Sequence, residues 1–257
     1  MRIESECFLL PKAGNRRDEY EDASHSSMHV HKETTVCRFA IADGASESSY
    51  AEQWANLLVK GYCFGRFGGM QIHRAVSPLS KAWQKKMNGK TLPWYAQEKL
   101  SSGAFSTLAG ITFRFAIDAD AAAFDAIAVG DSCIFHIRED KLIASFPLST
   151  ADDFGRRPVL ISSNTANNAQ LHEFVHRWSD IAGAGDEFWL MTDALACWLL
   201  TRYKEDTSVI RIMQKLADEH DFQHLVHEER RRPHHEGYFY LRNDDVTFIR
   251  LKLVKGK

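Results

Sequence analysis

Residues 107–146 read TLAGITFRFAIDADAAAFDAIAVGDSCIFHIREDKLIASF. β-Branched and aromatic residues dominate four runs in this stretch, which predict strands at Thr107–Phe115, Phe124–Val129, Cys133–Ile137 and Lys141–Phe146. Only a few residues separate consecutive runs, and Arg138-Glu139-Asp140 has the composition of a turn. Parallel strands need a crossover of about a dozen residues or more, so these short connections predict antiparallel hairpins.

Three further apolar runs predict strands at Thr35–Ala42, Glu187–Met191 and Val246–Leu253. Between the strands, apolar residues recur with helical spacing. The predicted helices span Ser48–Phe64, Leu79–Met87, Tyr95–Leu100, Ala194–Tyr203 and Ser208–His220. Helices that cover antiparallel sheet give an α+β fold. No repeat or linker divides the sequence, so we expect one domain over residues 1–257, with a mobile flap around residues 149–168.

The composition is that of an ordinary globular protein, with 44% hydrophobic and 26% charged residues and a formal net charge of −2. So small a net charge provides no general attraction to nucleic acid or to an anionic membrane, and we expect neither as a partner. The five cysteines form no Cys-x-x-Cys pair, which favours a reducing compartment. Because the N-terminus also lacks an apolar signal core, we expect a cytoplasmic protein.

Acidic residues recur along the chain, most of them where a predicted strand ends or begins. These positions are Glu21-Asp22, Asp43-Gly44, Gly130-Asp131, Thr192-Asp193 and Asp244-Asp245. A carboxylate at the end of a buried strand is costly unless a cation or hydrogen bonds compensate it. Several carboxylates brought together would repel one another, so the pattern predicts an all-carboxylate site for a hard divalent cation.

In order along the chain, these positions resemble the signature motifs of the metal-dependent type 2C protein phosphatase (PPM) family. The match begins at Arg17-Asp18-Glu19-Tyr20 and extends over nearly the whole chain. The resemblance implies a four-layer α-β-β-α sandwich of two antiparallel sheets flanked by helices. It also implies two Mn²⁺ or Mg²⁺ ions at one edge of the sheets and a third, more weakly held ion.

The resemblance implies direct metal ligands. Asp43 matches the carboxylate that bridges both metals, and Gly44 matches the residue that offers its backbone carbonyl. Asp193 and Asp244 match the other direct ligands of the second metal. Asp245 stands where asparagine is commoner, so it remains the alternative to Asp244.

Other matched residues have less direct roles in the family. Glu21 and Asp22 match the acidic pair that reaches the first metal mostly through bound water. Asp131 matches the position associated with the third metal. Arg17 matches the phosphate-binding arginine, and Arg16 is the alternative.

The function implied is that of a signalling enzyme that hydrolyses phosphoserine or phosphothreonine on a protein substrate and opposes a Ser/Thr kinase. Two divalent ions about 3.5–4 Å apart share a water, and the bridging hydroxide attacks phosphorus without a covalent intermediate. Asp43 and Arg17 are the expected catalytic residues. The sequence departs from the family at Ala45-Ser46-Glu47, where many members carry a histidine or small residue and then glycines, and at Ala194, where glycine is usual. A histidine general acid is therefore absent from this position.

Two alternatives remain open. The segment His172-Glu173-Phe174-Val175-His176 fits the His-Glu-x-x-His helix motif of zinc metalloproteases. The second alternative is a catalytically weak or inactive PPM-fold protein that serves as a binding or regulatory module, because a fold does not determine a function. The basic run Arg230-Arg231-Arg232 is interpreted as a solvated helix end.

Overall fold

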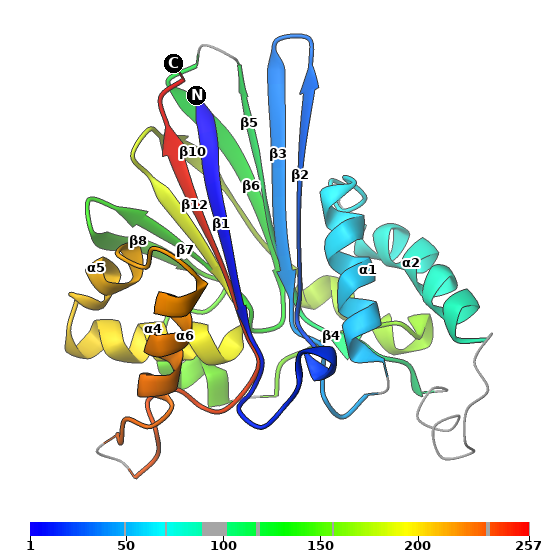
Figure 1. The fold of residues 1–257 in the computed structure, drawn as a ribbon. Helices are drawn as coiled ribbons and strands as arrows, with labels where there is room; N and C mark the ends of the chain where they lie inside the picture. The colour runs from blue at the N-terminus through cyan, green and yellow to red at the C-terminus, as the bar shows by residue number, and fades with distance from the viewer. Residues whose placement is uncertain are drawn as a thin grey trace.

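The computed structural model describes residues 1–48, 50–69, 71–88, 102–116, 119–155, 157–234 and 237–256. Two five-stranded antiparallel sheets pack against each other, and helices cover their outer faces (Figure 1). This arrangement confirms the predicted α+β fold with four α-β-β-α layers. The predicted helix Tyr95–Leu100 lies outside the described residues.

The first sheet contains both the earliest and the latest strand of the chain. Its order is β1 (Arg2–Leu10), β12 (Val246–Val254), β11 (Glu187–Met191), β7 (Cys133–Arg138) and β8 (Lys141–Phe146). Its outer face is covered by α4 (Asp193–Glu205), α5 (Val209–Gln214) and α6 (Glu219–Glu229) (Figure 1). Large buried side chains such as Phe8, Trp189, Trp198 and Phe222 fill this outer core, so burial of apolar surface holds the helices on the sheet.

The second sheet has the order β10 (His176–Gly183), β6 (Ala121–Val129), β5 (Leu108–Ala116), β3 (Thr34–Ala42) and β2 (Ala23–His31). Its outer face is covered by α1 (Ala51–Cys63) and α2 (Ile72–Met87) (Figure 1). The inner faces of the two sheets share a core in which the ring of Phe188 meets those of Phe113 and Phe124 edge to face, at 5.1 and 4.9 Å.

Short elements connect the layers. They are β4 (Phe105–Ser106), which pairs with β9 (Ile161–Ser162), and the 3₁₀ turns η1 (Arg17–Glu19), η2 (Ala151–Gly155), η3 (Thr165–Asn168) and η4 (Leu171–Phe174). The predicted hairpin between β7 and β8 is confirmed: Glu139 and Asp140 both adopt positive φ, at 49° and 60°, as a tight two-residue hairpin turn requires.

The helix boundaries differ from the prediction in two places. Helix α2 begins at Ile72 rather than Leu79 and continues through Pro78. The helix predicted at Ser208–His220 already ends at Gln214 as α5, and α6, which was not predicted, begins at Glu219, where the side chain of Asp218 accepts a hydrogen bond from the Asp221 amide (2.9 Å). None of the described helices is long and apolar enough to cross a membrane.

The zinc metalloprotease interpretation is wrong on geometric grounds. The motif needs two histidines one turn apart on a single α-helix. Here His172 lies in η4, which ends at Phe174, and His176 is the first residue of β10. The two histidines therefore do not share a helical face.

Candidate metal centre

Carboxylates that follow strands of both sheets meet at one edge of the sandwich. Strand β3 runs down to this edge in Figure 1. Asp43 follows β3, Asp131 follows β6 by two residues, and Asp193 opens α4 directly after β11. Ligand oxygens of these three residues all lie within 4.8 Å of one another. The two sheets thus bring together acidic residues that are far apart in sequence.

The three carboxylates line a cavity of about 340 Å³, the acidic cavity. Asp244, in the loop before β12, lines it as well. Its other lining residues are Gly44, Ala45, Ser46, Thr107, Phe154, Arg157, Pro158, Leu160 and Arg242. Phe154, Arg157, Pro158 and Leu160 come from the predicted flap segment, so the described part of this segment lies beside the acidic cavity; its mobility stays a prediction.

Hydrogen bonds fix Asp43 relative to the neighbouring turn. The Asp43 amide donates to Thr107 Oγ1 (2.8 Å), and the Thr107 amide donates to the Asp43 carbonyl (2.9 Å). Thr107 Oγ1 also lies 2.7 Å from Ser132 Oγ. Gly130 has φ +90°, and a β-carbon there would lie 2.7 Å from Thr107 Cγ2. Only glycine fits this turn, which holds Asp131 opposite Asp43.

The close packing of Gly44 brings the N-terminal loop to the acidic cavity. A β-carbon at Gly44 would lie 2.7 Å from the Glu21 carbonyl oxygen and 2.9 Å from Ala51. Glu21 Oε2 accepts a hydrogen bond from Ser46, a lining residue, and lies 3.7 Å from Lys12 Nζ. The absence of a side chain at Gly44 therefore allows Glu21 to lie beside the acidic cavity.

Asp22 is buried with one oxygen unsatisfied. Its Oδ2 accepts a hydrogen bond from Thr247 Oγ1 (2.8 Å), whereas Oδ1 has no hydrogen-bond partner among the described residues. Burial raises the pKa of Asp22 to about 7, and the negative charge of Asp245 adds to this effect against the Thr247 hydrogen bond. A buried carboxylate oxygen without a donor is a site at which a cation would be stabilising.

Negative charge accumulates around Asp43 in the same way. Burial raises the pKa of Asp43 well above its usual range, and the charges of Asp22, Asp131 and Asp244 raise it further. Burial likewise raises the pKa of Asp131. Divalent cations would supply the positive charge that these oxygens need and so reverse the effect.

Arg242 is a residue of the acidic cavity that the sequence did not reveal. Its guanidinium pairs with the Asp193 carboxylate, and its Nε lies 3.6 Å from Asp244 Oδ2. The Arg242 side chain is 45% exposed. It stands in the loop before β12, and no periodicity or motif marks it. Arg157, from the predicted flap segment, is a second cavity arginine that was missed.

Asp244 and Asp245 have different surroundings. Both oxygens of Asp245 accept backbone hydrogen bonds, Oδ1 from the Lys12 amide and Oδ2 from the Glu21 amide, at 2.8 Å each. Asp245 therefore anchors the N-terminal loop, whereas Asp244 lines the acidic cavity. This geometry favours Asp244 over Asp245 as the ligand.

The two candidate phosphate-binding arginines lie outside the acidic cavity. Arg17, in η1, is exposed and lines a separate cavity of about 260 Å³ together with Asp22 and Glu52. Arg16 is exposed and pairs with Asp18 through two contacts of 3.0 and 2.6 Å. The structure brings Arg17 next to Asp22 and does not bring Arg16 to the carboxylates.

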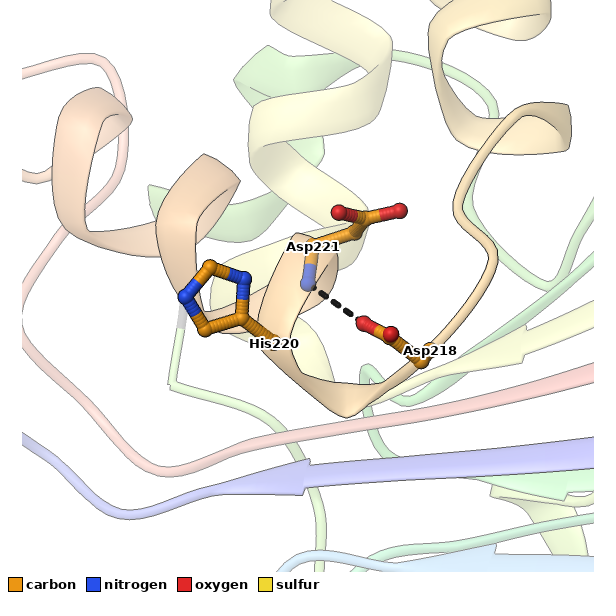
Figure 2. A group of neighbouring side chains, drawn as sticks. All are labelled: Asp218, His220 and Asp221. Atoms are coloured by element: carbon orange, nitrogen blue, oxygen red, sulfur yellow. Dashed lines mark hydrogen bonds between the residues drawn. The ribbon is translucent and has the colours of Figure 1, made fainter.

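A second acidic group lies at the start of α6. Figure 2 shows Asp218, His220 and Asp221, which are all exposed and whose ligand atoms lie within 4.8 Å of one another. Asp218 accepts a hydrogen bond from the Asp221 amide (2.9 Å), and Asp221 Oδ2 accepts one from the Ala217 amide (3.0 Å). These bonds give both carboxylates a capping role at the helix N-terminus.

A family model described as protein phosphatase 2C matches residues 15–229, which is most of the chain. The chain belongs to the protein phosphatase 2C family. No match was found among curated protein sequences.

Several solved structures share this protein phosphatase 2C fold. The phosphatase domain of SpoIIE from Bacillus subtilis has a TM-score of 0.52 and 18% identity, over 100% of this chain and 94% of that one. PppA from Pseudomonas aeruginosa has a TM-score of 0.52 and 13% identity, over 98% of each chain. The S. agalactiae serine/threonine phosphatase has a TM-score of 0.51 and 14% identity, over 97% of this chain and 100% of that one. At these identities the likeness establishes the fold alone.

The protein phosphatase 2C family depends on Mg²⁺ or Mn²⁺, and the described residues fit such ions. Hard cations prefer oxygen ligands, and the close group here consists of carboxylates. The unsatisfied Oδ1 of Asp22 and the raised pKa values of Asp22 and Asp43 show that the centre has more negative charge than its protein neighbours compensate.

Proposed function

We propose that this protein is a Mn²⁺- or Mg²⁺-dependent phosphatase that hydrolyses phosphoserine or phosphothreonine on proteins and opposes a Ser/Thr kinase. The observation that carries the proposal is the meeting of Asp43, Asp131 and Asp193 within 4.8 Å. It occurs in a chain of the protein phosphatase 2C family, at the edge where the two sheets meet.

The residues that would hold two cations share Asp43. Asp22 and Glu21 would complete the first site, Glu21 through water. Asp193 and Asp244 would complete the second, Gly44 would offer its backbone carbonyl, and Asp131 would serve a third ion. When bound, two such cations lower the pKa of a shared water toward neutrality and so supply the nucleophile for direct attack on phosphorus.

Arginine side chains would bind the phosphoryl group. A guanidinium donates two parallel hydrogen bonds to phosphate oxygens and balances the charge of the transition state. Arg17 remains our candidate for this role, since it makes no ion pair with another described residue and lies beside Asp22. Arg157 and Arg242 could add positive charge from the other side of the acidic cavity.

Proton transfer to the leaving alcohol would need a donor other than histidine. No histidine is among the residues that line the acidic cavity in the described part of the chain. Ser46, whose hydroxyl donates to Glu21, and a bound water are candidate donors near the carboxylates.

Metal add-back tests this function directly. The metal-stripped protein is given a phosphothreonine peptide with Mn²⁺, Mg²⁺ or Zn²⁺ added separately, and released phosphate is measured. We expect Mn²⁺ or Mg²⁺, but not Zn²⁺, to restore hydrolysis. Asp43→Asn should lower kcat by more than about 100-fold, because loss of even an outer partner of a metal ligand costs 10–100-fold.

Two results would contradict the proposal. Unchanged turnover in Asp43→Asn would exclude the mechanism. If none of the three metals restored hydrolysis although calorimetry showed Mn²⁺ binding, the alternative of a phosphatase-fold binding module would be favoured. Arg17→Ala separates recognition from catalysis, since it should mainly raise KM for phosphopeptide.

A further inference from the structure

A second cavity, of about 840 Å³, adjoins the acidic cavity, and Phe154 and Arg242 line both. We propose that this groove binds the part of a phosphoprotein that flanks the phosphorylated residue, and that it selects a flank with an acidic and an apolar side chain. The proposal rests on the proposed phosphatase function. We call the cavity the arginine groove; it is lined by η2, α4, the end of α6 and residues 237–243.

The apolar part of the arginine groove is suited to a protein segment. Ala194 and Cys197 of α4 lie on one side, and the loop residues Tyr238 and Phe239, 51% and 55% exposed, lie on the other. Exposed aromatic residues beside a groove are typical of interaction sites, where they anchor a partner's apolar side chain. The volume is within the range of about 300–1,000 Å³ in which proteins bind ligands.

The charges of the arginine groove favour an acidic occupant. Arg231 is exposed at the end of α6 and makes no ion pair with any other described residue. Exposed His227 lies one helical turn before it, and Arg242 lies toward the acidic cavity. Asp152 is the one acidic residue among the described lining residues. A carboxylate in the occupant would therefore meet an excess of positive charge.

Arg230 has a structural role that differs from that of Arg231. It is buried, and its guanidinium donates to the carbonyl oxygens of Pro11 (3.1 Å) and Asp244. This contact fixes the loop that leads to the acidic cavity and corrects the interpretation of the whole basic run as a solvated helix end. Within this basic run, Arg231 is the exposed cation that lines the groove.

The position of Arg242 connects the two cavities. It pairs with Asp193 and Asp244 on one side and lines the arginine groove on the other. A polypeptide that presents its phosphoryl group to the carboxylates can therefore continue past Arg242 into the groove. This continuity makes a substrate segment, rather than an unrelated ligand, the occupant that the geometry favours.

Peptide binding tests the inference without relying on catalysis. Each fluorescein-labelled peptide contains one phosphothreonine, one phenylalanine and one aspartate. Across the series, the phenylalanine and the aspartate occupy successive positions before or after the phosphothreonine. A matched series carries lysine in place of aspartate. Anisotropy with the Mn²⁺-loaded protein and a non-hydrolysable phosphonate form of each peptide gives each Kd. We expect one aspartate position to bind about tenfold more tightly than its lysine counterpart, which corresponds to ~1.4 kcal/mol.

Charge reversal provides the decisive variant. Arg231→Glu should reverse the preference, so that the lysine peptide binds more tightly than the aspartate peptide. Arg66→Glu is the matched control, because Arg66 is an exposed arginine just after α1, on the opposite outer layer. It should keep the wild-type preference. Loss of structure alone would weaken both peptides and would not exchange their order.

The outcomes separate the groove from the phosphatase function, because hydrolysis of the phosphothreonine peptides and of p-nitrophenyl phosphate is measured with Mn²⁺. Hydrolysis without any aspartate preference would overturn the groove and leave the function intact. A preference that Arg231→Glu reverses, without hydrolysis of either substrate, would retain the groove and overturn the function. Self-association in sedimentation velocity that Arg231→Glu abolishes would assign the groove to a second copy of the chain and overturn the proposal.

Discussion

At the scale of single residues, the Arg242 guanidinium and a divalent cation would compete for the oxygens of Asp193 and Asp244. The guanidinium already pairs with Asp193 and lies 3.6 Å from Asp244. It can neutralise these carboxylates, but it is held on a half-exposed side chain that can swing toward solvent. The same arginine could therefore release the carboxylates to a cation and turn toward substrate.

Arg242→Gln should therefore bind Mn²⁺ more tightly. We expect a twofold to fivefold lower Kd by calorimetry, about the value of one partly exposed ion pair. The metal-free variant should also lose about 0.5–1 kcal/mol of unfolding free energy. Arg242→Lys, which keeps the charge, is the control. Unchanged Mn²⁺ affinity in Arg242→Gln would show that the guanidinium does not compete with the metal.

Asp186 lies outside the acidic cavity and makes a pH-dependent contribution to the stability of the fold. It accepts two hydrogen bonds from Arg138, at 2.6 and 2.8 Å, and one from the Gly183 amide at 2.9 Å. Burial alone would raise the pKa of Asp186, but these donors outweigh it and lower the pKa below its usual value. A lowered pKa means that the ionised form stabilises the fold above the unfolded-state pKa of about 3.9, and that this stability is lost as the pH falls through the folded-state pKa.

Asp186→Asn should lower the unfolding free energy by about 1–3 kcal/mol at pH 7, as expected for hydrogen bonds to a charged group. The difference from wild type should shrink as the pH falls below about 4, because the unfolded carboxylate takes up a proton there while the native one is still ionised, and it should vanish below the lowered folded-state pKa. Urea unfolding of both proteins at pH 7 and below pH 4, followed by tryptophan fluorescence, measures the difference in unfolding free energy. An equal difference at both pH values would contradict the assignment.

At the scale of elements, the strands inside the sheets were predictable and three of the edge strands were not. The central strands β3, β5, β6, β7, β11 and β12 are apolar runs because most of their length is covered on both faces. The missed strands β1, β2 and β10 are edge strands with many exposed residues and polar sequences such as ASHSSMHVH. Pairing with a neighbour, rather than their own composition, makes them strands.

The residues of the candidate site likewise include some that the sequence predicted and some that it did not. Asp43, Asp131 and Asp193 were found because each follows a buried strand, where an acidic residue stands out. Arg242 and the arginine groove were not found, since they arise from loops and helix ends that meet only in three dimensions. Such residues carry no local periodicity for a sequence to reveal.

The contact between α1 and β5 depends on a missing side chain. A β-carbon at Gly110 would lie 2.6 Å from the ring of Tyr62, whose hydroxyl is 2.9 Å from Thr112 Oγ1. Gly110→Ala should force the helix outward and lower the unfolding free energy by about 1–3 kcal/mol. Gly183→Ala in β10 is the matched strand control, because a β-carbon there has no neighbour within 4 Å among the described residues. Equal stability of the two variants in urea would show that α1 moves freely.

At the scale of the whole molecule, a cation bound between Asp43 and Asp193 would connect the two sheets. Asp43 follows a strand of the second sheet, and Asp193 follows one of the first. A ligand that binds only the folded state at 100 times its Kd adds about 2.7 kcal/mol of stability. Mn²⁺ should therefore raise Tm by about 5–10 °C.

Differential scanning calorimetry of metal-stripped protein with and without Mn²⁺ measures this shift. Asp43→Asn should lose most of it, whereas Gly183→Ala should keep it, since Gly183 lies in β10 and does not line the acidic cavity. An unchanged Tm in the wild-type protein would contradict binding at the junction of the sheets.

The pairing of β1 with β12 has a consequence for synthesis on the ribosome. In the first sheet β1 is hydrogen-bonded only to β12, with Arg2 opposite Val254 and Leu10 opposite Val246, whereas every strand of the second sheet lies between residues 23 and 183. Translation at about 5–20 residues per second would release the whole second sheet before β1 has a partner. Phe8 and Leu10 therefore stay without their sheet partner on the nascent chain until β12 emerges, and an unpaired apolar strand is exposed to aggregation during that time.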